Sequence, residues 1–143
     1  MARRHRLQDL SPYTGCHADE RIGLDPLAIG WLHHKQPFNT GSVSKQFVQQ
    51  LHQFCQPENF VCEIPKAQPC AISRKVITMG EVTYGHAEIR VIGEEAIYAA
   101  PDLIYHYVTT YQYQPPQAFI DAVLTGPQPS SSEYKALIRT LQS

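Results

Sequence analysis

The stretch from residue 85 to residue 123 constrains the fold of this chain most strongly. It reads GHAEIRVIGEEAIYAAPDLIYHYVTTYQYQPPQAFIDAV. Segments 87–92 and 96–99 are rich in strand-forming side chains, and the Gly-Glu-Glu turn between them predicts a hairpin. Pro101 predicts the first turn of a helix, where its missing N–H costs nothing, and the proline pair 115–116 predicts the start of a second helix. A strand hairpin followed by two short helices is therefore expected.

The remaining elements are predicted around this stretch. An apolar stripe with helical spacing begins after Lys45 and predicts a helix there, with Ser42 or Ser44 as its N-cap. Ser130 and Glu133 match a capping box and predict a last helix through Leu141. Three further segments are predicted to be strands: 24–32, 60–64 and 71–79.

The order of these elements predicts an α+β fold, because helices and strands are grouped rather than strictly alternating. We expect a small, mainly antiparallel sheet of about four strands, packed by three to four helices. A chain of 143 residues is long enough to bury one core. We predict a flexible N-terminal segment at 1–22, a single α+β domain at 23–126, and a linker with a C-terminal helix at 127–143.

The charge balance excludes some classes of partner. The chain has 12 Lys and Arg against 13 Asp and Glu, a formal net charge of −1. Such a balance does not favour a nucleic-acid binder, and no apolar run is long enough to span a membrane. Because no apolar signal segment follows the basic start, we expect a cytoplasmic protein with reduced cysteines.

The metal-binding candidates are weak. Cys62, Cys70, His86 and His106 could contribute to a zinc site, but such sites usually show two cysteines separated by two to four residues. Cys62 and Cys70 lie farther apart, with two prolines between them. Separate buried thiols are therefore favoured, and no metal or other cofactor is predicted.

The triplet His86-Ala87-Glu88 resembles part of the zinc-deaminase signature, which also needs a downstream Pro-Cys-x-x-Cys. Here Pro69-Cys70 comes first and has no second cysteine at the required spacing. A strand in which Glu88 and Arg90 lie on one face, and pair with each other or with the neighbouring strand, is the favoured interpretation.

No catalytic residue is predicted from the cysteines either. A thiolate beside a protonated histidine would be reactive, but no cysteine stands in a glycine-rich turn. Cys55 falls at the end of the helix that begins after Lys45, where the helix dipole would raise the pKa of its thiol.

Aromatic and charged residues supply the remaining candidates for a ligand site or an interface. His106 is predicted at the edge of a helix core, either as a structural histidine or as a group in a pocket beside Tyr98 and Glu88. Trp31 precedes a loop that begins with two histidines. The full set of ligand or interface candidates is Trp31, His33, Glu88, Arg90, Tyr98, His106 and Tyr107.

The chain resembles a family of small, uncharacterised bacterial proteins. The resemblance is carried by AEIRV, IYAAPDLIYHYV and YQYQPPQAFIDAVL, and by the upstream segment AIGWLHHKQPFNTGSVSKQF. It covers about residues 27–124. It implies one domain with an α+β fold, and it implies no reaction.

This chain departs from that family at residues that would form a zinc site in relatives. The resemblance implies a His-x-Cys-x-x-Cys motif before the AEIRV strand, whereas this chain keeps Cys62 alone. It also implies a histidine at position 111, where this chain has tyrosine, although His106 remains. We therefore expect a degenerate zinc site whose space is filled by Phe60, Pro65 and Tyr111.

Two hypotheses on function remain open. The first is a non-catalytic binding or interaction module, in which aromatic residues meet an unknown partner protein or a second copy of the chain. The second is a small enzyme or ligand-binding protein with a pocket around His106. The first is favoured, because the sequence names no set of nucleophile, base and orienting group.

Overall fold

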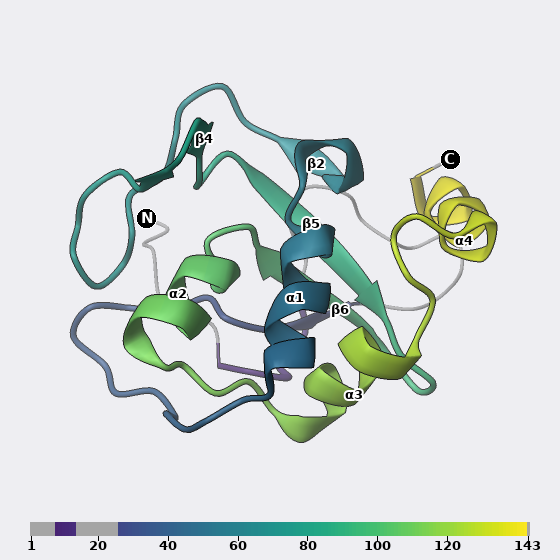
Figure 1. Ribbon diagram of the computed structural model, residues 1–143, viewed down its shortest axis with the longest axis horizontal. Helices are drawn as coiled ribbons and strands as arrows, with labels where there is room; N and C mark the ends of the chain where they lie inside the picture. Colours follow the sequence, from purple (N-terminus) through teal and green to yellow (C-terminus); the bar gives the residue numbers. More distant parts are fainter. Residues whose placement is uncertain (1–7, 14–25, 143) are drawn as a thin grey trace.

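The computed structural model describes residues 8–13 and 26–142. Within these residues four α-helices, one short 3-10 helix, a four-stranded sheet and a separate two-stranded hairpin form an α+β fold, as predicted (Figure 1). The described helices include none that is both long and apolar enough to cross a membrane.

The central sheet is mixed, with strand order β1-β6-β5-β2. Its strands are β1 (Leu27–Ala28), β2 (Cys62–Glu63), β5 (Ala87–Ile92) and β6 (Ile97–Pro101). β5 pairs antiparallel with both β6 and β2, whereas β1 pairs parallel with β6. The predicted hairpin therefore forms the centre of the sheet, and the one parallel pair lies at its edge.

The hairpin of β5 and β6 is buried on both faces. Ile89 lies opposite Ala100 and Val91 lies opposite Tyr98, and all four belong to the main hydrophobic core. Because side chains alternate along a strand, Arg90 points to the other face. Arg90 is nevertheless only 2% exposed, so this second face is covered as well.

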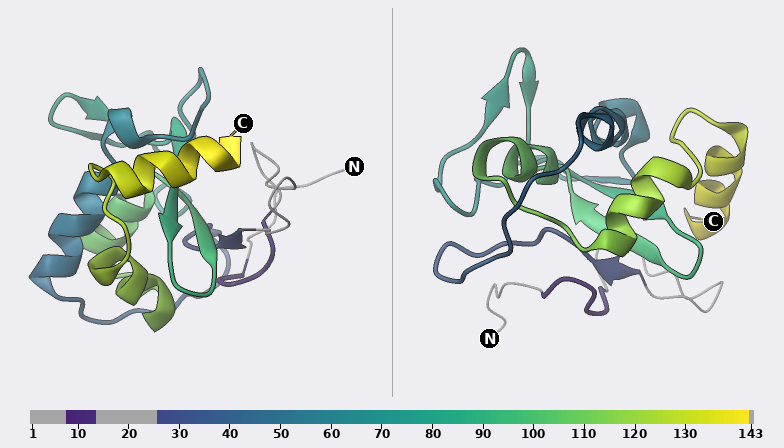
Figure 2. Two further views of the ribbon diagram at one scale, coloured as in Figure 1. Left: turned by 90° about the vertical axis from the view of Figure 1, so that its right-hand side faces the viewer. Right: turned by 60° about the horizontal axis from the view of Figure 1, so that its bottom comes forward.

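Three helices cover the first face of the sheet (Figure 2). They are α1 (Lys45–Phe54), α2 (Ile104–Tyr111) and α3 (Gln117–Thr125). The hydroxyl of Ser44 accepts a hydrogen bond from the N–H of Phe47 at 3.0 Å and so caps α1. Phe47, Leu51 and Phe54 form the buried stripe that was expected from their helical spacing.

The last helix, α4 (Ser132–Gln142), lies beside this layer and packs on the domain through Tyr134. The Tyr134 hydroxyl donates to the carbonyl of Arg90 at 2.7 Å, and its ring meets Phe54 edge-on. The cap of α4 is Ser131, whose hydroxyl accepts from the N–H of Tyr134, so the prediction of Ser130 as the cap was wrong by one residue.

Residues 8–13 lie against the other side of the sheet (Figure 2). The N–H of Leu10 donates to the carbonyl of Ala28 at 2.7 Å. The Asp9 carboxylate accepts hydrogen bonds from the N–H of Gly30 and from the hydroxyl of Tyr113. This part of the segment predicted to be flexible is therefore bound to the domain, while the rest of 1–22 lies outside the described residues.

The predicted strand at 71–79 is mostly a turn. The N–H of Cys70 donates to Lys75 and the N–H of Arg74 donates back to Cys70. Arg74 has a φ of 66°, which a strand cannot contain. Only β3 (Thr78–Met79) is extended, and it pairs with β4 (Val82–Thr83) in a separate hairpin. The prediction was wrong because only some of the β-branched residues lie in this small hairpin. The others lie before it, in the turn and just after the turn.

Two boundaries also differ from the prediction. Pro101 is the last residue of β6, paired with Glu88, and α2 begins three residues later at Ile104. The strand predicted at 24–32 is reduced to β1. Between α1 and β2 the chain adds the short 3-10 helix η2 (Pro57–Asn59), which begins at Pro57.

Candidate functional site

The main candidate site is a cavity of about 720 Å³, within the range of small-molecule sites. We call it the Trp31 pocket. It forms where the loop after β1, the segment 62–71, the start of β5 and the loop after β6 meet. The residues of its wall that carry the argument are Tyr13, Trp31, His33, Glu88, Asp102 and Tyr107.

One wall is a pair of stacked aromatic rings. The ring centroids of Tyr13 and Trp31 are 5.0 Å apart, with an angle of 14° between the planes. The indole N–H of Trp31 donates to the carbonyl of Ala99 at 3.0 Å, which fixes the ring against β6. Trp31 is the single tryptophan of the chain, so this wall carries its own spectroscopic probe.

Glu88 is held by two partners at the same wall. Its carboxylate accepts a hydrogen bond from the Tyr13 hydroxyl at 2.5 Å and pairs with Nη1 of Arg90 at 3.0 Å. The guanidinium carbon of Arg90 also lies 5.9 Å from the centroid of the Tyr13 ring, within cation–π range. The pairing of Glu88 with Arg90, expected from strand alternation, is therefore confirmed, and Tyr13 joins it from a segment far away in the sequence.

Asp102 is a nearly fully buried carboxylate in the pocket wall, 1% exposed. Both of its oxygens lie close to the N–H of Gly85, at 3.0 and 3.1 Å. Burial raises the pKa of Asp102, and the N–H groups of residues 85–87 oppose that shift. A carboxylate has about four lone-pair sites, so Asp102 retains room for about one further hydrogen bond from a ligand.

Gly85 makes this arrangement possible. It has a φ of +97°, and a Cβ atom at this position would lie 2.1 Å from the carbonyl oxygen of Gln68. Only glycine permits such a backbone and such a contact. The close approach brings the N–H of Gly85 to Asp102 and sets one side of the pocket.

Tyr107 adds a hydroxyl to the same wall from α2. Its oxygen accepts a hydrogen bond from the N–H of Ala71 at 3.0 Å, which joins the helix to the segment 62–71. Burial raises the pKa of Tyr107 to about 12. The hydroxyl therefore stays protonated at neutral pH and can donate to an acceptor.

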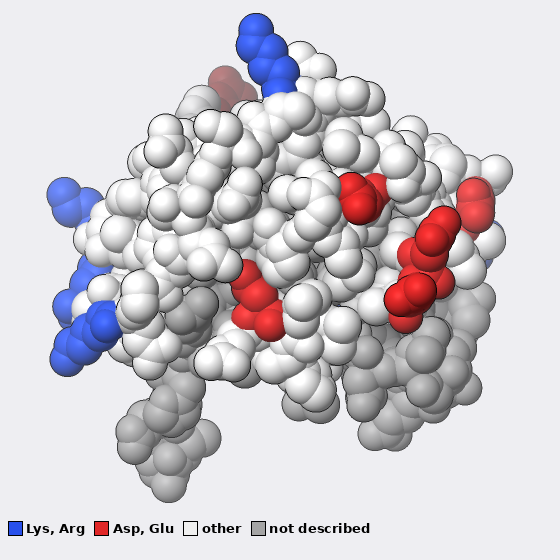
Figure 3. Space-filling view, turned by 90° about the horizontal axis from the view of Figure 1, so that it is seen from below, with Lys and Arg blue, Asp and Glu red and all other residues white. Residues whose placement is uncertain are grey.

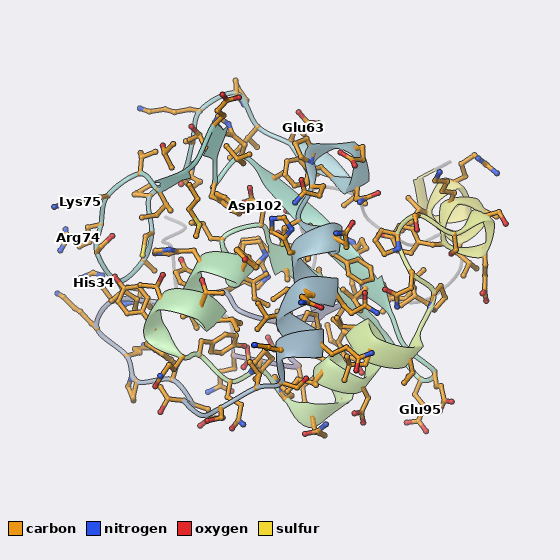
Figure 4. All side chains as sticks on the ribbon, in the orientation of Figure 1. His34, Glu63, Arg74, Lys75, Glu95 and Asp102 are labelled. Carbon is orange, nitrogen blue, oxygen red and sulfur yellow. The ribbon has the colours of Figure 1, made fainter. Side chains whose placement is uncertain are left out.

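Basic side chains, three of them cationic at neutral pH, gather beside the pocket. We call them the basic rim: His33, His34, Lys35, Arg74 and Lys75. His33 lines the pocket and stacks on His34, with ring centroids 4.7 Å apart. Slight desolvation, and then the charge of Arg74, lower the pKa of His34, which places the two loops of the rim within electrostatic reach of each other. His34, Arg74 and Lys75 lie along one edge of the molecule in Figure 4.

A second cavity, of about 650 Å³, lies between the turn of the β5–β6 hairpin, α3 and α4. We call it the acidic hollow, because four carboxylates line it: Glu94, Glu95, Asp121 and Glu133. Tyr98 also lines it, and burial, then Glu95 and Asp121, raise the pKa of its hydroxyl. Figure 3 shows most acidic side chains of this face over its centre and right and most basic ones at its left end.

The structure separates residues that the sequence analysis grouped around His106. Glu88 lines the Trp31 pocket and Tyr98 lines the acidic hollow, whereas His106 lines neither cavity. His106 is 7% exposed, packs edge-on to Tyr111 and lies 3.3 Å from the hydroxyl of Thr110. Burial lowers the pKa of His106, and its Nε2 atom has no hydrogen-bond partner in the described part of the chain. This is the environment of a neutral, buried histidine.

The described residues contain no group of three or more His, Cys, Asp or Glu side chains that could hold a metal ion. Nor do the residues expected to fill a degenerate zinc site form a common interior cluster. Pro65 is exposed, while Phe60 and Tyr111 are partly buried. His86 is partly exposed, and its Nδ1 atom lies 3.1 Å from the carbonyl of Ile64, so it belongs to the β2–β5 edge.

The cysteines differ from one another. Cys55 and Cys70 are buried free thiols, as expected. Burial, then the charge of Asp102, raise the pKa of Cys55, so the direction expected for this thiol is correct although the helix dipole is not its main cause. Cys62 lines the Trp31 pocket and is disulfide-bonded, which corrects the expectation of a reduced thiol there. Cys16 lies outside the described residues.

Of the sequence candidates, four line the Trp31 pocket: Trp31, His33, Glu88 and Tyr107. Arg90 contacts the pocket through Glu88. Tyr13 and Asp102 were not among the predicted site residues. Asp102 directly follows Pro101, the predicted helix start, and nothing local links it to Gly85, which is 17 positions away. Tyr13 stands in a turn-forming segment whose sequence carries no sign of a contact with β5.

The chain belongs to a family described as a domain of unknown function (DUF7919), whose model matches residues 5–124. This is consistent with the resemblance seen in the sequence motifs. No match was found among curated proteins or solved structures.

Proposed function

We propose that this chain is a non-catalytic binding protein. The Trp31 pocket holds a small organic ligand whose N–H groups donate hydrogen bonds to the carboxylates of the pocket. One observation carries the proposal: two carboxylates, Asp102 and Glu88, line an otherwise largely apolar cavity with an aromatic wall. Specific pockets are typically apolar cavities in which a few placed polar groups set the orientation of the ligand.

The polar groups of the pocket favour a ligand that carries hydrogen-bond donors. The carboxylate of Asp102 is held by the backbone N–H groups of residues 85–87. The ion pair of the described residues joins Glu88 to Arg90 and does not involve Asp102. A ligand N–H group would supply the charge-assisted hydrogen bond that this carboxylate can still make. The stacked rings of Tyr13 and Trp31 would contact a flat body.

The enzymatic alternative is less well supported. His106, its intended centre, lines neither cavity. The sulfur of Cys62, the cysteine in the wall, is already bonded. A nucleophile within reach of a base and an orienting group, which catalysis of this kind needs, is missing from the described wall of the pocket.

The cytoplasmic location remains a prediction. The free thiols of Cys55 and Cys70 agree with it, whereas the disulfide at Cys62 is typical of an oxidising compartment. Self-association also remains a prediction, which sedimentation of the purified chain would test.

Fluorescence of Trp31 tests the binding proposal directly. Benzamidine, a flat compound whose edge presents N–H donors, should change the emission of Trp31 in a saturable manner. Methyl benzoate, of similar size but without N–H groups, should bind more weakly by about tenfold or more, because hydrogen bonds to a charged group contribute about 1.5–3 kcal/mol.

Two variants separate the pocket from the rest of the surface. Asp102→Asn keeps the shape of the side chain and should remove the preference for benzamidine. Gln68→Trp adds bulk at an exposed residue of the pocket mouth and should weaken both compounds, although its added tryptophan requires calorimetry as the readout. Lys135→Gln, exposed on α4, is the matched control. Equal binding of the two compounds to all four proteins would contradict the proposal.

A further inference from the structure

The basic rim lies at the mouth of a pocket whose interior carries acidic groups. Among the residues of the pocket, Asp102 and Tyr107 are buried, whereas Gln68 and Pro69 are exposed and form the outer part of the wall. His33 joins the pocket to the rim, since it lines the cavity and stacks on His34. In Figure 4 Asp102 lies in the interior, and the labelled rim residues lie at the edge.

The second loop of the rim is fixed by its own hydrogen bonds. The N–H of Arg74 donates to the carbonyl of Cys70 at 2.8 Å, and the N–H of Cys70 donates to the carbonyl of Lys75 at 2.9 Å. The next residue after Cys70 is Ala71, which lines the pocket and donates to the Tyr107 hydroxyl. The two cations therefore stand on a turn that is tied to the pocket wall.

The charges of the rim are not neutralised within the described part of the chain. The ion pair found there joins Glu88 to Arg90, and it involves none of the rim residues. Lys35, Arg74 and Lys75 are all exposed. Like charges brought together without a counter-charge favour binding of an anion, and a phosphate accepts hydrogen bonds from several such donors at once.

We propose that the ligand of the Trp31 pocket is a phosphorylated small molecule, whose N–H donors face Asp102 and whose phosphate binds the basic rim. This inference rests on the proposed function. A ligand with donors at one end and an anion at the other matches the acidic interior and the basic mouth. A cavity of about 720 Å³ has room for a molecule the size of a mononucleotide.

Calorimetric titration with GMP and with guanosine tests the inference. Both present N–H donors on a flat ring, and only GMP carries a phosphate. GMP should bind about tenfold more tightly than guanosine or better, and added salt should reduce the difference because the rim is exposed. Inorganic phosphate alone should compete with GMP and not with guanosine.

The double variant Arg74→Asn/Lys75→Gln should remove the advantage of GMP and leave guanosine binding within about twofold. Asparagine is chosen at position 74 because it tolerates the positive φ of that residue. The matched control is Lys45→Gln/Lys135→Gln, which removes two exposed lysines from α1 and α4 and should leave the advantage of GMP unchanged.

The outcomes separate the two proposals. Equal binding of GMP and guanosine, or a GMP advantage that persists in Arg74→Asn/Lys75→Gln, would overturn the phosphate inference and leave the binding pocket in place. Binding of benzamidine without binding of either guanosine or GMP would likewise overturn the phosphorylated class. If the pocket variants lose binding of benzamidine, guanosine and GMP, and the affinities of the wild type follow the predicted order, both proposals are supported.

Discussion

The two cavities of this domain are similar in volume and differ in how they are built. The Trp31 pocket joins five separate segments of the chain and is lined by buried polar groups such as Asp102 and Tyr107, each with a hydrogen-bond partner. The acidic hollow is lined by carboxylates that are exposed, including Glu94, Glu95 and Asp121.

The two cavities differ in the free-energy cost of removing their carboxylates from water. A buried carboxylate loses its hydration and must be compensated by hydrogen bonds or by an opposite charge. An exposed carboxylate keeps its hydration and needs no partner. The Trp31 pocket is therefore a preorganised site, whereas the acidic hollow is a surface depression with a local excess of negative charge. Four predictions test this comparison.

The largest effect is expected at the glycines of the two cavities. Gly85→Ala places a Cβ atom 2.1 Å from the oxygen of Gln68 at a residue with a φ of +97°, and should lower the free energy of unfolding by about 3 kcal/mol. Gly126→Ala, at the acidic hollow, meets the oxygen of Ile92 at 2.4 Å but has an ordinary φ, and should cost about 2 kcal/mol. Urea denaturation measures both, and a larger loss at Gly126 would reverse the comparison.

The next effect is expected at the carboxylates. Glu88→Gln leaves Arg90, which is 2% exposed, without its counter-charge and should lower the free energy of unfolding by about 2 kcal/mol. Glu95→Gln should change it by less than about 0.5 kcal/mol, because Glu95 is exposed and lies among like charges. Equal effects in urea denaturation would show that burial does not distinguish the two sites.

A smaller effect is expected in the dependence of stability on pH. Folding raises the pKa of Asp102 above its ordinary value of 3.8, so the folded state binds the proton more tightly than the unfolded state. The contribution of Asp102 to the free energy of unfolding is therefore greatest below that value. It falls as the pH rises through the pKa that Asp102 has in the folded protein. Asp102→Asn removes this loss. Its melting temperature relative to the wild type should rise with pH over this window, and a difference that does not vary with pH would contradict the prediction.

The smallest effect is expected at Tyr98. Burial raises the pKa of its hydroxyl first, and the charges of Glu95 and Asp121 add to the shift. Glu95→Gln should lower the pKa of Tyr98 slightly, as followed by NMR titration of the labelled ring. Glu58→Gln, in η2 and not among the residues that shift Tyr98, serves as the control and should leave the titration unchanged. A change of the same size in both variants would assign the effect to net charge.

Local patterns were sufficient for the elements that carry a regular apolar period or a clear turn. The helix α1 follows from an apolar stripe and a serine cap, and the β5–β6 hairpin follows from two β-rich segments around a short turn. The ion pair of Glu88 with Arg90 follows from the alternation of side chains along a single strand. Each of these features depends on neighbours within a few positions.

The errors occur where hydrogen bonds that the residue pattern does not reveal override local preference. The β-branched residues of 71–79 were read as a strand, but the backbone hydrogen bonds between Cys70 and Lys75 form a turn instead. Pro101 suits a helix start and yet ends β6, because it pairs with Glu88 at the open end of the hairpin. Asp102, the residue after this predicted helix start, instead accepts a hydrogen bond from the N–H of Gly85.

The sequence alone determined the α+β class, the central hairpin, the buried stripes of the helices and the presence of several pocket residues, since hydrophobic periodicity and turn residues act over short distances. Only the tertiary structure decided which of these residues meet. It placed Tyr13 against Glu88 across 75 positions of sequence and separated His106 from the pocket. Long-range hydrogen bonds between buried polar groups select such contacts, and they leave no local signal in the sequence.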